Sequence, residues 1–127
     1  MILGVGIDII EVARVQGSVE RFGERFLKRI LLPDETAYCM LHKNPAPFIA
    51  ARFAAKEAIS KAFGTGIGAK LGWLDMEVVT DTHGRPALLL HGRAAARATE
   101  LGVVRTHLSL THSDASAGAV VILEADG

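Results

Sequence analysis

Two carboxylates stand where the sequence is otherwise apolar. Asp8 interrupts the β-branched run from Ile2 to Ile10, and Glu57 lies in an alanine-rich segment that would be apolar on all sides as a helix. A buried carboxylate is costly unless a metal, a cationic partner or solvent compensates its charge. Two carboxylates from separate elements, with Lys61 nearby, form the few-ligand arrangement that Mg²⁺ uses when substrate phosphates complete its shell. The pair leads to the hypothesis of magnesium-dependent phosphate chemistry.

Each carboxylate also has a purely structural interpretation. Asp8 could cap the element that begins near Ile10, because aspartate is a favoured helix cap. Glu57 could form an ion pair with Lys56 or Lys61, which lie close to it on the same predicted helix. The residues alone leave these alternatives open.

Other polar residues carry weaker signals. The stretch from Gly64 to Gly68 offers backbone N–H groups that can cradle phosphate, but a glycine that ends a helix before a turn explains it equally well. It also lacks the lysine and serine of a P-loop. His112 and Ser113 fall in a predicted turn, where they could bind an anion or be solvated. The remaining histidines show no metal-ligand spacing, namely His42, His83, His91 and His107.

The first half of the chain predicts one strand and three helices. The run from Ile2 to Ile10 predicts a strand buried on both faces or at an interface. Apolar residues at helical spacing, and proline or glycine at the boundaries, predict helices over residues 18–32, 33–42 and 47–63. Arg52 and Lys56 project from within the apolar arc of the last helix, so their charges need partners.

The second half predicts two hairpins separated by a short helix. Strands are expected over residues 74–80 and 87–91 around a turn at 81–86, and over 106–111 and 117–123 around a turn at 112–116. A helix is expected over residues 93–101, ending at Gly102. This order predicts an α+β fold in which residues 1–127 form a single domain without linker or repeat.

Composition narrows the function classes. The 127 residues carry 14 Lys plus Arg and 14 Asp plus Glu, so the zero net charge argues against a dedicated nucleic-acid binder. The single Cys39 has no intramolecular disulfide partner, and no signal segment or membrane-spanning apolar run is evident. We therefore expect a cytoplasmic protein that binds neither nucleic acid nor membrane.

Basic residues gather in the predicted first helical region. Arg14, Arg21, Arg25 and Lys28 are interleaved with Glu20 and Glu24. This pattern is usual for a solvated face. It is also the best surface that the sequence offers for docking an acidic protein.

Three motifs together resemble one known family. They are Gly4 to Glu11 (GVGIDIIE), Ala51 to Ala62 (ARFAAKEAISKA) and Leu108 to Ser113 (LSLTHS). In this order and chain length, the sequence resembles the holo-acyl-carrier-protein synthase type of 4′-phosphopantetheinyl transferase over nearly its full length. The stretches Phe63 to Ile67 and Gly84 to Pro86 also look like loops of that family.

The resemblance implies specific site residues. Asp8 and Glu57 would hold Mg²⁺, Lys61 would neutralise phosphate charge, and these three would form the catalytic group. The hairpin loop would lie near the adenine of coenzyme A, and Thr111 to Ser113 near its 3′-phosphate. The coenzyme A site implied in this way comprises Arg52, Lys56, Lys61, Gly64, Thr65, Gly84, Arg85, Pro86, Thr111 and His112.

The resemblance also implies a reaction and an assembly. The phosphopantetheine arm of coenzyme A would move to a serine of an apo acyl carrier protein in fatty-acid or polyketide biosynthesis, releasing adenosine 3′,5′-bisphosphate. The general base would be Glu57, Asp8 or a metal-bound water. An antiparallel sheet would pack on a long central helix, and a homotrimer would form active sites between subunits. The carrier would dock on Arg14, Arg21, Arg25 and Lys28.

Three functions from other classes compete with this interpretation. The same fold could bind coenzyme A or a nucleotide as a sensor without transfer. The metal and lysine could activate water, giving a magnesium-dependent phosphohydrolase. A purely structural trimerisation domain would need none of the three charged residues.

Overall fold

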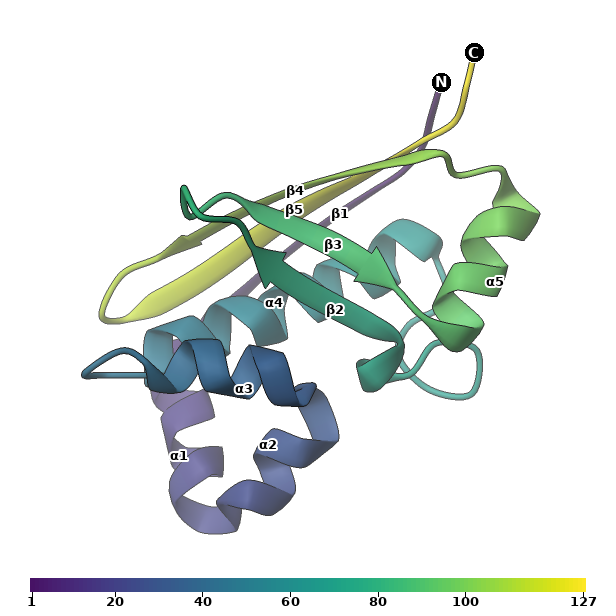
Figure 1. The fold of residues 1–127 in the computed structure, drawn as a ribbon. Helices are drawn as coiled ribbons and strands as arrows, with labels where there is room; N and C mark the ends of the chain where they lie inside the picture. The colour runs from purple at the N-terminus through teal and green to yellow at the C-terminus, as the bar shows by residue number, and fades with distance from the viewer.

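The computed structural model describes residues 1–127, arranged as two separate antiparallel sheets around one long helix (Figure 1). Strands β1 (Ile2–Glu11), β5 (Ser116–Glu124) and β4 (Arg105–His112) form a three-stranded sheet in the order β1-β5-β4. Strands β2 (Met76–Thr80) and β3 (Pro86–Leu90) form a two-stranded hairpin of their own. The helix α4 (Ala46–Phe63) packs against one face of the three-stranded sheet and also contacts β2, so the α+β prediction with a long central helix is confirmed.

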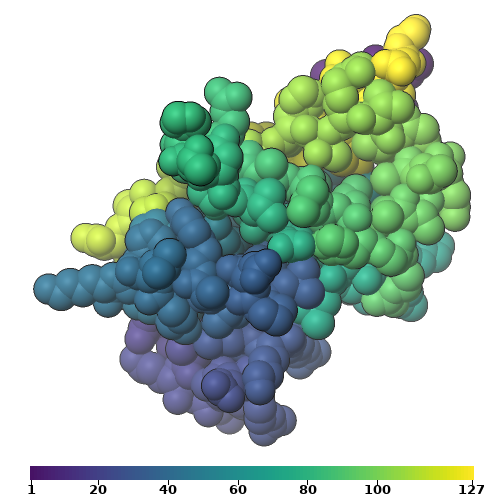
Figure 2. Space-filling model, viewed as in Figure 1, coloured from purple at the N-terminus to yellow at the C-terminus, as the bar shows by residue number.

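The remaining helices cover the ends of α4. Helices α1 (Val12–Phe22), α2 (Glu24–Ile30) and α3 (Pro33–Met40) form one lobe, the purple and blue part of Figure 2. The short helix η1 (Trp73–Asp75) precedes the hairpin, and α5 (Gly92–Leu101) follows it. None of the helices combines the length and apolar character that a membrane crossing requires.

One helix prediction is wrong. Residues 18–32 do not form a single helix, because α1 begins already at Val12 and the chain turns at Gly23 before α2 starts. Gly23 has φ 55°, a backbone conformation that side-chain-bearing residues rarely adopt. The apolar pattern runs across the break because both helices bury residues in the same core, Val15 from α1 and Leu27 and Ile30 from α2. The other predicted helices and strands are confirmed, with ends shifted by a few residues.

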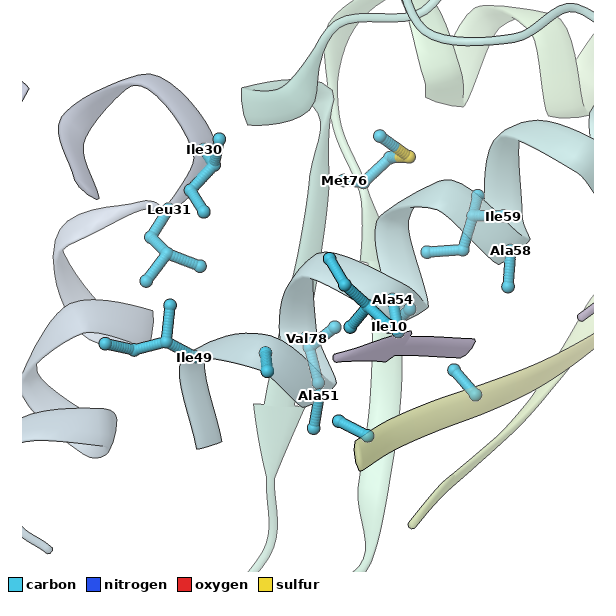
Figure 3. Packing of buried hydrophobic residues seen from close by; sticks show 14 of the residues in the cluster. Ile10, Ile30, Leu31, Ile49, Ala51, Ala54, Ala58, Ile59, Met76 and Val78 are labelled. Atoms are coloured by element: carbon cyan, nitrogen blue, oxygen red, sulfur yellow. The ribbon is translucent and has the colours of Figure 1, made fainter. Parts of the chain in front are cut away.

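The core is built around α4. Its alanines are fully buried among larger residues contributed by the other elements, such as Ile30, Met76 and Val78 (Figure 3). Small side chains let neighbouring backbones approach closely. On β1, Gly4 and Gly6 lie against the carbonyl oxygens of Ala62 and Ala58, where an added Cβ would overlap the oxygen. This close approach brings the strand that carries Asp8 directly onto the helix that carries Glu57.

The other face of the three-stranded sheet is open. Val5, Ile7 and Ile9 of β1 are 57%, 69% and 75% exposed, whereas Gly6 and Ile10 on the opposite face are buried. The strand prediction is confirmed, but burial of both faces within this chain is wrong, since α4 covers one side only. An apolar row is left in solvent along β1.

Candidate active site

Asp8 faces α4 and meets Lys61. Its Oδ1 lies 3.0 Å from Lys61 Nζ, and the same ammonium donates to the carbonyl oxygen of Ile7 at 3.0 Å. The alternative in which Asp8 caps a helix is wrong, because α1 starts at Val12 after Glu11, without any side-chain cap. Asp8 is therefore held in place by the glycine-mediated packing of β1 and by Lys61.

Glu57 lies one helical turn before Lys61 and completes the group. Its side chain is half-buried and has no ion-pair partner, because Lys61 is engaged with Asp8. The ion-pair alternative for Glu57 is therefore wrong. Burial, and next the negative charge of Asp8, raise the pKa of the Glu57 carboxyl, while Lys61 opposes the shift. The two carboxylates are thus close enough for their charges to interact, and one lysine, paired with Asp8, compensates them.

This donor set fits a hard cation. Mg²⁺ accepts one or two protein carboxylates when phosphate oxygens and water fill the rest of its octahedral shell. No group of three or more histidine, cysteine, aspartate or glutamate side chains gathers anywhere in the chain, so a closed all-protein metal cage is not present. Asp8 and Glu57 suit an open site that a phosphorylated substrate completes.

A second recess lies between α4 and the hairpin. It has a volume of about 160 Å³ and receives side chains from α3, α4, β2, the hairpin loop and the end of β4. Four residues expected at the coenzyme A site meet here, namely Arg52, Gly84, Pro86 and His112. We refer to this recess as the hairpin pocket.

Arg52 is anchored at the wall of the hairpin pocket. Its Nη2 donates to Thr80 Oγ1 at 2.9 Å, and its guanidinium carbon lies 4.2 Å from the centre of the Tyr38 ring. The Nε of Arg52 is buried without a partner, so the guanidinium keeps unused donor capacity.

Aromatic rings pack together at that wall, and no spacing in the sequence indicates them. Phe48 stacks on His42 with ring centroids 3.5 Å apart, and His112 tilts against Phe48 at 4.7 Å. Tyr38 packs edge-on against both Phe48 and His42. Tyr38, His42 and Phe48 lie within eleven residues of the chain, but His112 joins them from the distant strand β4, and no local pattern reveals that contact. Flat apolar walls with one cation match a nucleotide base and phosphate.

Comparison with known proteins gives the family. The sequence profile of the 4′-phosphopantetheinyl transferase superfamily matches residues 4–120. The chain belongs to this superfamily. It is 52% identical over 124 residues to the holo-[acyl-carrier-protein] synthase of Koribacter versatilis, covering 98% of this chain and 99% of the relative. The resemblance found in the motifs is therefore confirmed, and the chain is a phosphopantetheinyl transferase.

Solved structures of similar proteins agree. The holo-[acyl-carrier-protein] synthase of Neisseria meningitidis superposes with a TM-score of 0.90 at 33% identity, covering 98% of this chain and 99% of that one. The Helicobacter pylori holo-[acyl-carrier-protein] synthase, solved in complex with coenzyme A, gives 0.85 at 34% identity, covering 94% and 99%.

Lys56 does not lie at the surface of this transferase. Its side chain is fully buried and donates to Glu35 Oε1 at 2.7 Å, to the Trp73 carbonyl at 3.1 Å and to the Ile30 carbonyl. Direct contact of Lys56 with coenzyme A, expected from the resemblance, is therefore wrong for this conformation. The adjacent residue Glu57 points to the site, but Lys56 points into the core.

The glycine-rich stretch after α4 ends the helix. Gly64 has φ 76°, its N–H donates to the Lys61 carbonyl, and the N–H of Thr65 donates to Ser60. These two amides are used in capping, so the phosphate-cradle alternative is wrong for them. The Thr65 hydroxyl bonds the Gly66 carbonyl at 3.2 Å, beyond the end of α4 that carries Lys61.

Two residues at the end of β4 that were expected to bind coenzyme A, Thr111 and His112, lie on opposite faces of the strand. His112 lines the hairpin pocket, but Thr111 lines a hollow on the open face of the three-stranded sheet, together with Ile7 and Ile9. Ser113 serves the turn, where its Oγ accepts from the N–H groups of Ala115 and Ser116. One chain therefore does not bring Thr111 and His112 to the same pocket.

The hairpin loop and the basic residues are exposed. Gly84 has φ 80° at the tip of the loop, and the N–H of Arg85 donates to Asp81 Oδ1, which leaves the Arg85 guanidinium in solvent. The predicted docking residues all lie exposed on α1 and α2, namely Arg14, Arg21, Arg25 and Lys28. Arg14 also borders a shallow recess with Ile10 at the end of β1.

Cys39 is not a nucleophile. It is completely buried, and burial is the main cause that raises the pKa of its thiol to about 11.

Proposed function

We propose that the chain transfers the 4′-phosphopantetheine group of coenzyme A to a serine of an apo acyl carrier protein, releasing adenosine 3′,5′-bisphosphate. The main support is the pairing of Asp8 on β1 with Lys61 on α4 at 3.0 Å. The half-buried Glu57 lies one turn before Lys61 on α4, and the same helix places Arg52 at the hairpin pocket. Arg52 and Glu57 are five residues apart, about 7.5 Å along the helix axis. They point about 140° apart around that axis, so the nucleotide end and the diphosphate of one extended substrate would lie along different sides of α4.

The protein supplies charge and position for the reaction. Mg²⁺ held by Asp8 and Glu57 would offset negative charge on the diphosphate oxygens of coenzyme A. Lys61 adds a second positive charge, and its bond to Asp8 keeps that charge beside the carboxylates. Arg52 and the aromatic wall hold the nucleotide end, so the β-phosphorus faces the incoming serine.

The reaction would be a displacement at the β-phosphorus of coenzyme A. The serine oxygen bonds to the β-phosphorus, the bond from that phosphorus to the bridging oxygen breaks, and adenosine 3′,5′-bisphosphate leaves with the electron pair. The serine proton passes to a carboxylate. Glu57 is better suited than Asp8 because it has no ion-pair partner and a raised pKa.

The carrier protein would dock on the basic face of α1 and α2. Arg14, Arg21 and Arg25 are exposed and have no ion-pair partners, whereas Lys28 pairs loosely with Glu24 at 3.6 Å. The proposal assumes a carrier protein with an acidic docking surface, and complementary charge would steer that surface to this basic face. Arg14 lies closest to β1 and links the docking face to the strand that carries Asp8.

A homotrimer with sites between subunits is the assembly that we propose. The apolar row Val5, Ile7 and Ile9 lies on the same open face as Val120 and Thr111 and borders a hollow of about 570 Å³. Apolar surface of this kind is stabilised by burial against another chain. Thr111 lies on that face, so a neighbouring copy would bring it to the site of the next subunit.

The test is incubation of the protein with coenzyme A, Mg²⁺ or Mn²⁺ and apo carriers of fatty-acid and polyketide synthesis. Intact mass spectrometry should show one phosphopantetheine added per carrier, with the addition lost in chelator, in Asp8→Ala and in Lys61→Met. Lys70→Met, which changes an exposed lysine in the loop after α4, is the matched control and should keep full activity.

Two other outcomes would contradict the proposal. Free phosphopantetheine without modified carrier would identify the phosphohydrolase. Binding of coenzyme A without any product, with a carrier that another transferase can modify, would identify the sensor.

A further inference from the structure

A buried ion pair crosses the centre of the molecule. Lys56 of α4 and Glu35 of α3 are joined at 2.7 Å, and both side chains have 0% exposure. They are the only charged residues besides Arg52 among the buried residues of the chain. The catalytic scheme proposed above uses neither of them.

Every hydrogen-bonding group of this pair has a partner. The three N–H donors of Lys56 go to Glu35 and to the carbonyls of Ile30 and Trp73. Glu35 Oε1 also accepts from the N–H of Leu32 at 2.8 Å, and Oε2 accepts from the N–H of Val78 at 2.9 Å. The pair therefore connects α4 with the end of α2, the start of α3, η1 and β2.

Many of the buried side chains around Lys56 on α4 are small and apolar. The helix packs through alanines that are almost fully buried, namely Ala50, Ala51, Ala54, Ala55 and Ala58, and through the larger buried side chains of Ile49, Ile59 and Phe63. Apolar burial is not directional, and a row of methyl groups resists rotation of a helix about its axis less than large interlocking side chains do. The three directional contacts of Lys56 add a specific restraint on that rotation at the middle of α4.

Rotation of α4 decides where its site residues point. Glu57 follows Lys56 directly, about 100° further around the helix, and Lys61 lies one turn beyond Glu57. At the other end, Arg52 has its own anchors in Thr80 and Tyr38. The half of α4 that carries Glu57 and Lys61 has fewer polar anchors.

We propose that Lys56 and Glu35 are positioning residues, whose buried ion pair sets the rotation of α4 and thereby holds Glu57 and Lys61 opposite Asp8. Lys56 does not touch the phosphates of coenzyme A. This inference deepens the proposed transferase function and rests on it for its kinetic readout. A buried ion pair adds little net stability compared with apolar residues of similar volume, so a role in alignment explains it better than a role in stability.

The experiment compares three variants of the full chain. Glu35→Gln changes a residue that lines neither the hairpin pocket nor the hollow beside Asp8 and Lys61, so it removes no ligand contact. Lys56→Met/Glu35→Gln removes both charges and avoids leaving one unpaired, which keeps the test available where the single variant unfolds. Ile59→Val, a fully buried change on the same helix, is the control for lost stability alone.

The kinetic result should separate alignment from binding and from stability. We expect kcat for carrier modification to fall at least fivefold in Glu35→Gln and in the double variant, with the Kd for coenzyme A by calorimetry within threefold of the parent. Ile59→Val should keep kcat within twofold even though its Tm falls. A tenfold weaker Kd in the double variant would show that Lys56 binds phosphate, and an unchanged kcat would show a purely structural pair. Either result overturns the inference.

A crystal structure of Glu35→Gln, or of the double variant, decides the inference without catalysis. If the parent protein transfers nothing, the proposed function fails, but the alignment can still be read from the Lys61–Asp8 bond, which is 3.0 Å in the parent. Loss of that bond supports the positioning role. Its retention at the same length, with α4 unrotated, overturns it.

Discussion

Gly6 of β1 lies directly against the carbonyl oxygen of Ala58 on α4, with no space for a Cβ atom between strand and helix. Gly4 makes the same approach to Ala62 one turn further along. The two glycines set the distance between β1 and α4, and Asp8 is the next residue on that face of the strand. The separation of the two carboxylates is therefore fixed by glycine backbone rather than by any side chain of the site.

Gly6→Ala should separate the strand from the helix. The added methyl group meets backbone, which cannot move away as a flexible side chain can, so the cost should reach about 3 kcal/mol, the upper end for overpacked cores. Thermal unfolding and carrier modification should both fall sharply. Gly17→Ala is the control, because Gly17 lies within α1 with nothing near its Cβ position, and this change should add about 0.5–1 kcal/mol. Equal stability of the two variants would contradict the packing argument.

Glu57→Gln should stabilise the protein while it removes activity. Burial and Asp8 raise the pKa of Glu57 above its ordinary value of 4.5, so the charged form is disfavoured only in the folded state. Stability is therefore lost as the pH rises from about 4.5 through the raised pKa. The variant should have a higher Tm than the parent at pH 8 but a similar Tm at pH 4, with transfer lowered on the order of 10²-fold.

Calorimetry at both pH values tests whether Glu57→Gln raises the Tm at pH 8 and leaves it unchanged at pH 4. Glu20→Gln is the exposed control on α1. The control should show the parent's Tm at both pH values. A Tm for Glu57→Gln that stays at or below the parent's at pH 8 would show that the Glu57 carboxylate is not under electrostatic strain.

Arg14→Glu/Arg21→Glu should weaken carrier docking. Reversing two exposed charges on α1 should raise the KM for the carrier on the order of tenfold, with the KM for coenzyme A unchanged, and the defect should shrink at high salt. Steady-state kinetics at two ionic strengths measures this. Arg97→Glu on α5, away from the docking face, should leave both KM values within twofold. An equal effect of Arg97→Glu would assign the loss to net charge alone.

Ile9→Asp should prevent self-association. Ile9 is 75% exposed on the open face of the sheet, so a charge there would be forced into any interface that covers this face. Light scattering after gel filtration should change from a trimer to a folded monomer, and transfer should fall with it. Leu41→Asp is the matched control, since Leu41 is 81% exposed beyond α3 and should keep the parent's mass. A parent that is already monomeric would refute the proposed assembly.

The charged residues of the candidate site were predictable because charge in an apolar element is conspicuous. Asp8 and Glu57 stood out in the sequence for this reason, and the structure brings them within range of each other's charge, with Lys61 paired to Asp8. The same reasoning failed for Lys56. On a helix that is apolar on all sides, sequence does not tell which charges face inward, and the partner Glu35 lies 21 residues earlier on another element.

The break at Gly23 and the packing of Phe48 against His42 and His112 were not predicted, although His112 itself was expected at the coenzyme A site. The apolar repeat continues from α1 into α2, so periodicity alone joins them, and only the positive φ of Gly23 separates them. The wall formed by His42, Phe48 and His112 depends on tertiary contact between a loop, α4 and β4. Long-range packing of this kind has no local sequence pattern.

The separation of the two sheets has a consequence for how the transferase senses its substrate. Strands β3 and β4 pack beside each other without strand pairing, so the hairpin is joined to α3 and α4 by bonds such as Arg52 to Thr80 and Glu35 to Val78. Such a unit can open locally while the three-stranded sheet stays intact. A nucleotide gripped by both His112 and the hairpin loop would bridge the sheets, and part of its binding free energy would become local folding free energy of the hairpin. The free energy of local unfolding of this hairpin would then rise with the fraction of the enzyme that has coenzyme A bound.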